Sequence, residues 1–521
     1  MKKYKYHNPV QRGFFPDPSV IRVGQDYYMV NSSFQYFPAI PISHSRDMVH
    51  WHIIGHAITE PDWLDIGDIK DSHGIWAPDI EYVDGKYYII ATLRLNADGK
   101  RNNNVMRRQL LMHAERPEGP YSKPQCIEID DIDPSFFVDS DGKKYITIAK
   151  AVNLFPVSED FSELVGDGKM IWEGTGERCP EGPHIQKIGD YYYAILAEGG
   201  TGYGHGINVA RSKELYGEYE VSPYNPVMRQ TDTSAVLQRC GHGKLVQDSN
   251  GKWWCYYLCA RPNKGKYSTI GRETALDPVE FTPDGWFKIN RGCGPSLTQD
   301  APDLTPVIYE KKLYDDFDSS VLSLEWEFVR LPDRGSYSLT ERPGHFRIWT
   351  RDGQLNEIRA KNTLLRREEE LYYEAECKVE FYPDKNGEQA GLTCYYSTAT
   401  YIRCSLCYEE GRKLQLVINR NHGEELIAEE KDIKEIPLII RVETKGLSRS
   451  FSYSYDGESF KIIGEVENCI FLCDEGVPDD PKRHTGTMVG IYANNGGCGS
   501  RKKADFDYFG INYSKHKTIQ L

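Results

Sequence analysis

Residues 79–90 read DIEYVDGKYYII, and the same pattern occurs at four other places in the first 260 residues. In each unit an acidic residue or a histidine leads an apolar strand, a turn rich in Gly and Asp follows, and a second, aromatic strand ends the unit. The other four units are DPSVIRVGQDYYMV (17–30), DPSFFVDSDGKKYITI (133–148), EGPHIQKIGDYYYAIL (181–196) and HGKLVQDSNGKWWCYYL (242–258). Strand-forming residues on both sides of DG, GD or NG predict five β-hairpins.

The five units follow one another at intervals of 48 to 62 residues. Such a repeat of β-units is typical of a propeller, in which four-stranded blades surround a central axis. The innermost strands line that axis, so we expect the lead residues to meet at one mouth: Asp17, Asp79, Asp133, Glu181 and His242. One Asp alone is usually a turn residue. Five lead residues in register indicate a functional site, because crowded carboxylates raise the electrostatic free energy and perturb pKa values.

A group of carboxyls on an axis suits the hydrolysis of glycosidic bonds. One carboxylic acid protonates the leaving oxygen, and a second carboxylate activates water or attacks the sugar. A third can hold the acid protonated by charge repulsion. The sequence has no G-x-S-x-G, H-E-x-x-H, P-loop or dinucleotide-binding motif that would support a different chemistry.

Several segments resemble glycoside hydrolase family 43. They are GFFPDPSVIRVGQDYYMVNSSFQYFPAIPISHSRDMVHW, GIWAPDIEYVDGKYY, DIDPSFFVDSDGKKY, PEGPHIQKIGDYYY and GHGKLVQDSNGKWW, in this order. The resemblance is to the branch of β-xylosidases and α-L-arabinofuranosidases that carries a C-terminal concanavalin-like β-sandwich. It implies an all-β chain, with a five-bladed β-propeller followed by an antiparallel β-sandwich.

The resemblance also implies roles for the lead residues. Asp17 in FPDPS matches the general base, Asp133 in IDPSF the residue that raises the pKa of the acid, and Glu181 in PEGPH the general acid of an inverting mechanism. Asp79 in WAPDI matches no catalytic role, which favours a structural or outer position. The family often holds a calcium ion on the propeller axis. His242 in CGHGK matches a residue near it, and we expect contact through water because calcium prefers oxygen ligands.

Three further matches imply contacts with the substrate. Phe34 in SSFQYFP and Trp76 in IWAPD match aromatic walls of the pocket, and Arg272 in IGRET matches an arginine that reaches sugar hydroxyls. From the residues alone, Phe34 and Trp76 would be core aromatics and Arg272 a partner in a surface ion pair.

A change of pattern after NRGCGPSLTQDAPDLTP indicates a second domain. We expect the propeller to span residues 1–305 and the sandwich residues 306–521, where longer alternating strands such as YYEAECKVEFYP occur. One interpretation of this domain is a lid whose loop, carrying Phe506, helps to close the pocket. A packing domain at the propeller edge is the equal alternative, and a separate carbohydrate-binding module is a third.

Composition limits the partners and the compartment. The chain has 521 residues and a net charge of -14, which disfavours nucleic acid and anionic membranes as partners. Thirteen cysteines, an odd number scattered along the chain, indicate reduced thiols, and the basic start MKKYKYHNPVQRGFFPDP is not followed by an apolar run. We therefore expect a cytoplasmic protein without a secretory signal. The sequence does not predict an oligomeric state.

These observations predict an inverting exo-glycosidase that releases terminal α-L-arabinofuranosyl or β-D-xylosyl residues, or both, from (arabino)xylo-oligosaccharides. It would need no organic cofactor. The alternatives are a non-catalytic carbohydrate-binding propeller, against which the three acids count, and an endo-arabinanase, which would need an open cleft. Retaining propellers that cleave fructans open with N-D-P-N-G, which is not found here.

Overall fold

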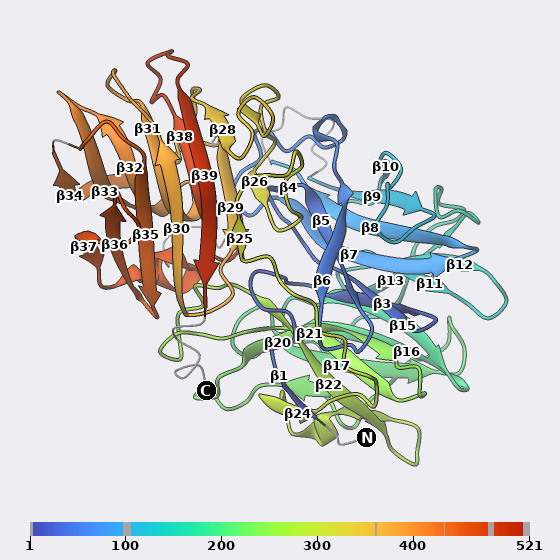
Figure 1. Ribbon diagram of the computed structural model, residues 1–521. Coiled ribbons are helices and arrows are strands. Elements are labelled where there is room, and N and C mark those ends of the chain that lie inside the picture. Colours follow the sequence, from blue (N-terminus) through green and yellow to red (C-terminus); the bar gives the residue numbers. More distant parts are fainter. Residues whose placement is uncertain (1–3, 97–105, 360–361, 432, 478–483, 514–521) are drawn as a thin grey trace.

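The computed structural model describes residues 4–96, 106–359, 362–431, 433–477 and 484–513. In Figure 1 the chain forms two parts that lie side by side, a blue-to-green propeller and an orange-to-red sandwich. Within these ranges helical structure is confined to short 3₁₀ turns: η1 (Pro61–Trp63), η3 (Asn290–Gly292), η4 (Cys469–Leu472) and η5 (Asp474–Gly476). In the described ranges no helix has the length and apolar character needed to cross a bilayer.

Five antiparallel sheets form the blades of the propeller, as the repeat predicted. Their strands, blade by blade from the axis outward, are β2 (Ser19–Val23), β3 (Asp26–Val30), β5 (Ala39–Ser45) and β6 (His52–Ile58); β7 (Gly74–Val83), β8 (Lys86–Arg94), β9 (Arg107–Ala114) and β10 (Gln125–Ile127); β11 (Ser135–Val138), β12 (Lys144–Ile148), β13 (Val152–Val157) and β14 (Lys169–Trp172); β15 (Glu181–Ile188), β16 (Tyr191–Glu198), β17 (Gly206–Ser212) and β18 (Glu220–Val221), with β19 (Met228–Arg229) also on β17; and β20 (Gln238–Gln247), β21 (Trp253–Ala260), β22 (Glu273–Phe281) and β23 (Phe287–Ile289).

The predicted hairpins join the first two strands of each blade. In the second blade Val83 pairs with Lys86, and the two turn residues between them, Asp84 and Gly85, have φ of 52° and 80°. Positive φ at both positions is the mark of a type I′ turn, which matches the twist of the flanking strands and favours Asp-Gly. The N-terminal strand β1 (Lys5–His7) pairs with β24 (Thr298–Asp300), which ties the start of the chain to the end of the propeller.

Two eight-stranded sheets form the sandwich. One contains β25 (Tyr314–Asp315), β27 (Tyr337–Ser338), β28 (Phe346–Trp349), β30 (Tyr372–Glu380), β35 (Leu438–Lys445), β36 (Ser448–Ser454), β37 (Lys461–Val466) and β39 (Lys503–Asn512). The other contains β4 (Tyr36–Phe37), β26 (Glu327–Val329), β29 (Thr363–Arg367), β31 (Gln389–Ser397), β32 (Thr400–Tyr408), β33 (Arg412–Arg420), β34 (Gly423–Glu430) and β38 (Met488–Asn494). Their inner faces form one apolar core.

Phe506 belongs to this core, so the prediction that it lies on a lid loop is wrong. It sits in the middle of β39, opposite Phe346 of β28, and is completely buried. Side chains alternate between the two faces of a strand, and the face that carries Phe506 is turned toward the second sheet.

The two parts are joined by a shared sheet. Strand β4 lies in the propeller sequence between β3 and β5 but pairs with β26, where Phe37 faces Phe328. Next to it Arg330, which has no exposed surface, donates to the Ile69 carbonyl at 2.6 Å and to Asp71 Oδ1 at 2.8 Å. The predicted division at residues 305/306 falls between β24 and β25 and stays a prediction.

Candidate active site

A pocket of about 90 Å³ lies at one mouth of the propeller axis. The seven residues that the sequence analysis assigned to the site all line it. The complete lining is Asp17, Phe34, Trp76, Ala77, Ile132, Asp133, Glu181, Thr201, His242, Arg272 and His484.

Several of these residues have strained backbones. Asp17, Phe34, Asp133 and His242 have φ between 48° and 56°, although none is a glycine. Left-handed conformations of this kind cost about 1–3 kcal/mol each and gather at functional sites, where the surrounding structure enforces them. The strain therefore supports a site that holds these side chains at fixed angles.

Asp17 precedes β2 and is almost fully buried, with 5% of its surface exposed. Its Oδ2 accepts from Ser32 Oγ at 2.6 Å, and its Oδ1 accepts from Arg272 Nη1 at 2.8 Å. Burial alone would raise the pKa of Asp17, but the charges of Arg272 and His242 and the Ser32 hydrogen bond bring that pKa below its ordinary value. Asp17 is therefore ionised near neutral pH.

Arg272 is buried, so the alternative of a surface ion pair is wrong. Besides its two contacts with Asp17, it donates from Nη1 to Thr201 Oγ1 at 3.4 Å and from Nε to the His484 carbonyl at 3.3 Å. The guanidinium also lies 5.7 Å from the centre of the Phe34 ring. Arg272 thus connects the proposed base to the wall of the pocket and to the second domain.

Asp133 and Glu181 behave as one electrostatic unit. Asp133 Oδ2 accepts from the backbone N–H of Gly182 at 3.0 Å, which holds it beside Glu181. Burial, followed by the charges of Glu181 and Asp17, raises the pKa of Asp133 well above its ordinary value. Two neighbouring carboxyls resist being ionised together, so the pair retains a proton.

The position of that proton differs from the prediction. The resemblance to family 43 implied that Asp133 raises the pKa of Glu181. Burial does favour the protonated form of Glu181, but a hydrogen bond and charge from His205, together with the charge of His242, bring its pKa below the ordinary value. The raised pKa belongs to Asp133 and the lowered one to Glu181.

His205 is a site residue that the sequence analysis missed. Its imidazole is fully buried, with Nδ1 at 3.1 Å from the Arg239 carbonyl and Nε2 at 3.4 Å from Glu181 Oε1. A carbonyl only accepts, so Nδ1 carries a hydrogen. Nε2 of the neutral ring is then an acceptor, and its contact with Glu181 needs a proton on one of the two atoms. The only signal in the sequence is a histidine between two glycines, in GYGHG.

Phe34 and Trp76 form an aromatic wall, with ring centres 6.3 Å apart. Phe34 exchanges backbone hydrogen bonds with Ile75, and Trp76 Nε1 donates to the Ser72 carbonyl at 2.7 Å. The two backbones approach so closely that a Cβ on Gly74 would lie 2.1 Å from the Phe34 carbonyl oxygen. Phe34 also packs in a buried aromatic cluster, so it is both a core residue and part of the pocket wall.

Asp79 does not reach the pocket, which corrects the expectation that all five lead residues converge there. It is completely buried in β7 and accepts hydrogen bonds from Ser19 Oγ at 2.6 Å and the Phe136 N–H at 2.8 Å. Lys244 Nζ also lies 2.6 Å from its Oδ1. These contacts join four blades, its own and three others, so Asp79 is structural, as the family match favoured.

The described residues supply no set of direct ligands for the calcium ion implied by the resemblance. Calcium takes six to eight oxygen ligands. Asp79 already faces the ammonium of Lys244, and His242 contributes a nitrogen that lies 3.6 Å from Asp17 Oδ1. Within the part of the chain that the structure describes, no three His, Cys, Asp or Glu side chains are placed to hold a metal. His242 is better described by its proximity to Asp17; burial lowers its pKa, and the neighbouring charges of Asp17 and Glu181 act in the opposite direction.

The second domain supplies His484 to the pocket. This residue precedes β38, and its N–H donates to Asp474 Oδ2 at 3.1 Å. The segment is pressed against the fifth blade, since Thr487 N donates to the Thr269 carbonyl and Gly271 leaves no room for a Cβ beside Gly486. A contribution of the sandwich to the pocket was one of the expected alternatives, but the residue is His484 and not Phe506.

Comparison with known proteins agrees with this geometry. The family model described as glycosyl hydrolases family 43 matches residues 6–287, and the model described as the β-xylosidase C-terminal concanavalin A-like domain matches residues 314–512. The chain belongs to glycosyl hydrolase family 43. It is therefore a glycoside hydrolase, and the five blades and the sandwich are those of its family.

Members of family 43 with similar sequences cover nearly the whole chain. A non-reducing end α-L-arabinofuranosidase from Bacteroides ovatus is 34% identical over 97% of this chain and 94% of its own length. A β-xylosidase from Bacillus subtilis is 33% identical over 97% of this chain and 99% of its own length. Among solved structures, a family 43 protein from Bacillus licheniformis is 56% identical with a TM-score of 0.96, covering 98% of this chain and 100% of that chain.

Proposed function

We propose that this family 43 enzyme is an inverting exo-glycosidase that removes terminal xylosyl or arabinofuranosyl units, or both, from short (arabino)xylo-oligosaccharides. The observation that carries the proposal is a pocket of about 90 Å³ in which two carboxyls with separate sets of partners, Asp17 and Glu181, meet. The named activities of the Bacteroides and Bacillus subtilis relatives support the choice of sugars.

The size of the pocket favours attack at a chain end. His484 and Thr201 narrow it on the side of the second domain and the fourth blade. A polymer bound along its length would need a cleft open at both ends, so the endo-arabinanase alternative is disfavoured. A non-catalytic binding propeller is disfavoured because three neighbouring carboxyls with shifted pKa values, two of them buried, are costly in free energy and unnecessary for binding alone.

In the proposed reaction Asp17 removes a proton from water as that water attacks the anomeric carbon. Its lowered pKa keeps it ionised, as a base must be. Glu181 donates a proton to the leaving oxygen, and the proton retained among Asp133, Glu181 and His205 supplies it. Arg272 holds Asp17 and faces the pocket, where it can donate to a sugar hydroxyl.

Product analysis tests the proposal. An arabinose-decorated xylo-oligosaccharide should yield free monosaccharides from the first time points, without intermediate-sized internal fragments. Proton NMR of the first-formed sugar should show inverted configuration, which corresponds to carboxyls about 6.5–9.5 Å apart. Early internal fragments would contradict the exo mode, and a retained anomer would make Asp17 a nucleophile.

A further inference from the structure

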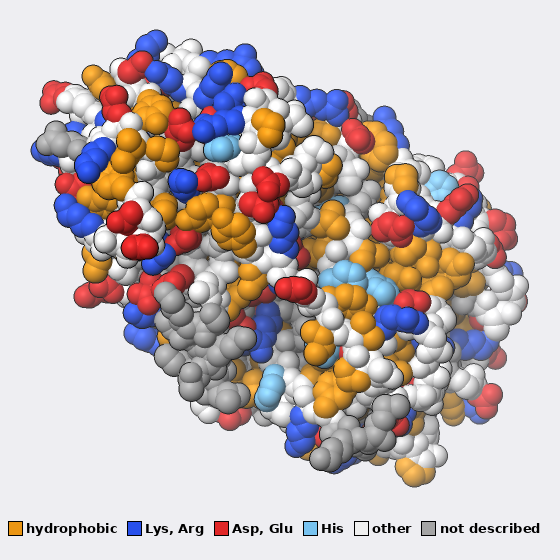
Figure 2. Space-filling view, in the orientation of Figure 1, with side chains coloured by type: hydrophobic (Ala, Val, Ile, Leu, Met, Phe, Trp, Pro, Cys, Tyr) orange, Lys and Arg blue, Asp and Glu red, His pale blue; other side chains and the backbone are white. Residues whose placement is uncertain are grey.

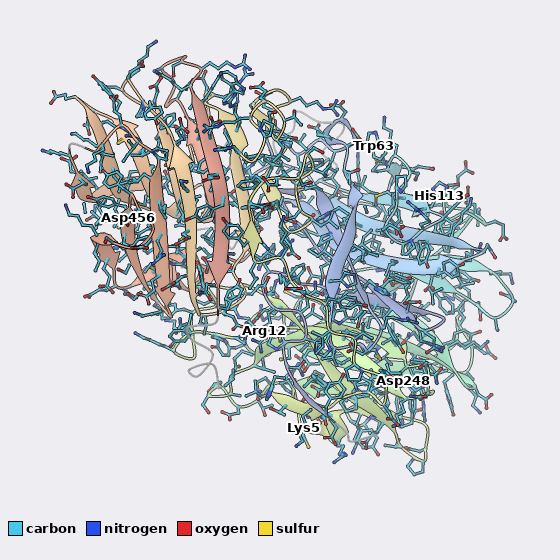
Figure 3. The ribbon with its side chains drawn as sticks, in the orientation of Figure 1. Lys5, Arg12, Trp63, His113, Asp248 and Asp456 are labelled. Atoms are coloured by element: carbon cyan, nitrogen blue, oxygen red, sulfur yellow. The ribbon has the colours of Figure 1, made fainter. Side chains whose placement is uncertain are left out.

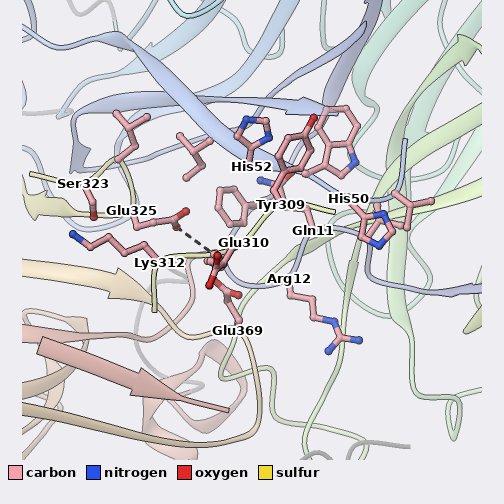
Figure 4. A pocket seen from close by; sticks show the side chains of 17 residues that line it. Gln11, Arg12, His50, His52, Tyr309, Glu310, Lys312, Ser323, Glu325 and Glu369 are labelled. Carbon is pink, nitrogen blue, oxygen red and sulfur yellow. Dashed lines mark hydrogen bonds and ion pairs between the residues drawn. The ribbon is translucent and has the colours of Figure 1, made fainter. Parts of the chain in front are cut away.

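A second and larger cavity, of about 450 Å³, lies where the propeller, the linking segment and the sandwich meet. Figure 4 shows it with His52, Tyr309 and Gln11 toward one side and Ser323, Glu325 and Lys312 toward the other. It shares no lining residue with the catalytic pocket. Its volume falls in the range of small-molecule binding sites, roughly 300–1,000 Å³.

The cavity lies at the boundary between the two parts of the molecule. Figure 3 places Arg12 at this boundary, away from Asp248 in the propeller and Asp456 in the sandwich. In the space-filling view a group of histidine side chains lies near the same boundary, on the face turned to the reader (Figure 2). Ligands often bind at such junctions between domains.

Aromatic side chains form one wall of the cavity. Tyr309 stacks on His52 with ring centres 3.7 Å apart, and Trp51 is fixed by a hydrogen bond from its Nε1 to the Met48 carbonyl at 3.1 Å. Tyr309, Trp51 and His52 are all half-buried. Rings that are fixed and partly exposed offer flat apolar area with a polar edge, which suits the C–H face of a sugar.

Two polar atoms at the cavity lack partners among the described residues. Gln11, only 7% exposed, donates from Nε2 to Ser43 Oγ at 3.0 Å, but its Oε1 is buried without a hydrogen bond. If the amide were turned over, its nitrogen would be the unpartnered atom instead, so one remains in either orientation. Ser323 Oγ is also buried and unpartnered. Both atoms have almost no accessible surface, so a ligand in the cavity would reach them only after a side-chain movement.

The charges in the lining balance, with three acidic and three basic side chains: Glu310, Glu325, Glu369, Arg12, Lys311 and Lys312. Several of them neutralise each other or close neighbours. Lys311 forms ion pairs with Glu369 and, at 3.6 Å, with Glu325, and Arg12 pairs with Glu370. The cavity therefore favours neither an anion nor a cation. It favours a neutral molecule with hydroxyls that can both donate and accept.

We propose that this cavity is a second carbohydrate-binding site, which takes one or two units of a neutral oligosaccharide separately from the catalytic pocket. A sugar ring would lie on the Tyr309 wall, and its hydroxyls would pair with the charged side chains that line the cavity. The choice of xylo-oligosaccharide as the probe rests on the proposed function, whereas the site itself rests on the cavity.

Calorimetric titration of the Glu181→Gln protein with xylotriose tests the proposal, because this variant should bind without turnover. We expect two binding events per chain. In the same background Tyr309→Ala, which removes the ring, and Ser323→Phe, which fills the space, should each weaken one event by roughly tenfold or more and leave the other. Tyr216→Ala, which removes an exposed tyrosine outside both pockets, is the matched control and should change neither.

One binding event in the parent, or two that neither cavity variant alters, would overturn the proposal. Thermal unfolding of each variant checks that it is folded. If Tyr309→Ala does not fold, Ser323→Phe still tests the cavity. Hydrolysis of xylotriose by the unmodified enzyme is measured separately. Its absence would count against the proposed function, whereas a second event that responds to the cavity variants would still support the second site.

Discussion

Asp17 accepts hydrogen bonds from Ser32 on one oxygen and from Arg272 on the other, so an amide at this position cannot satisfy both donors. We expect Asp17→Asn and Glu181→Gln each to lower turnover of oligosaccharides by ~10²–10⁴-fold, the usual contribution of general acid–base catalysis. On a substrate with an activated aryl leaving group, Glu181→Gln should lose less than Asp17→Asn, because that group needs little protonation. Steady-state kinetics on both substrates measures this, and near-parental turnover of either variant on the oligosaccharide would remove that residue from the mechanism.

Asp133 determines the pH above which the carboxyls of the site lose their shared proton. Its pKa is raised well above the ordinary value by burial and by the charge of Glu181, whereas the pKa of Glu181 is lowered. In Asp133→Asn the neutral amide can neither hold the proton nor repel a charge on Glu181. Glu181 then ionises at lower pH, so the alkaline limb of kcat/KM should move to lower pH and activity should recover in part on acidification. If kcat/KM of Asp133→Asn falls at every pH while its alkaline limb stays at the parental pH, this role of Asp133 is contradicted.

His205 should shift the same limb in the opposite direction. Its hydrogen bond and charge lower the pKa of Glu181, so in His205→Ala burial is no longer offset and that pKa should rise. The alkaline limb should therefore move to higher pH. Because the proton-sharing contact is lost, kcat on oligosaccharides should fall by ~10-fold or more, and less on aryl glycosides. If the alkaline limb of His205→Ala lies at the same pH as that of the parent enzyme, His205 has a packing role only.

At the scale of elements, Gly74, the first residue of β7, allows the close backbone approach that positions the aromatic wall. Gly74→Ala places a Cβ 2.1 Å from the Phe34 carbonyl oxygen at a φ of 95°, so it should lower the free energy of unfolding by more than about 1 kcal/mol. Gly85→Ala is the matched control: its φ of 80° gives similar backbone strain, but the new Cβ meets nothing within 4 Å. Denaturant unfolding should rank Gly74→Ala as the less stable, and equal stabilities would contradict the importance of this close approach.

The strands and hairpins could be predicted from the sequence because turn residues and alternating strand residues lie within a few positions of each other, as at Asp84 and Gly85. The convergence of Asp17, Asp133 and Glu181 followed from the repeat, which carries long-range information in periodic form. Three features left no periodic signal. Asp79 forms an ion pair with Lys244 instead of facing the pocket. His205 directly precedes β17, the third strand of the fourth blade, and contacts Glu181. His484 comes from the second domain. His205 and His484 depend on contacts with segments outside the repeat, and the Asp79–Lys244 pair joins two repeat units through a lysine whose counterparts in the other units are not lysines.

At the scale of the whole molecule, the catalytic pocket is complete only while the two domains stay together, because His484 comes from the sandwich and its carbonyl accepts from Arg272. Arg330 is a buried link across that junction. Arg330→Ala would leave Asp71 buried without its guanidinium, although Thr398 still donates to it, and loss of one partner of a buried ion pair typically costs about 3–5 kcal/mol.

We therefore expect Arg330→Ala to lower the unfolding midpoint and to raise KM for oligosaccharides, as the wall that carries His484 becomes less well held. Arg334→Ala is the matched control, since Arg334 also crosses the junction, to Glu60 at 3.1 Å, but both side chains are more than half exposed. Exposed pairs contribute about 0–1 kcal/mol, so this variant should resemble the parent in both measurements. If the two variants have the same unfolding midpoint and the same KM, the buried Arg330–Asp71 pair does not fix the relative position of the domains. The strand pairing between β4 and β26 would then fix it without that pair.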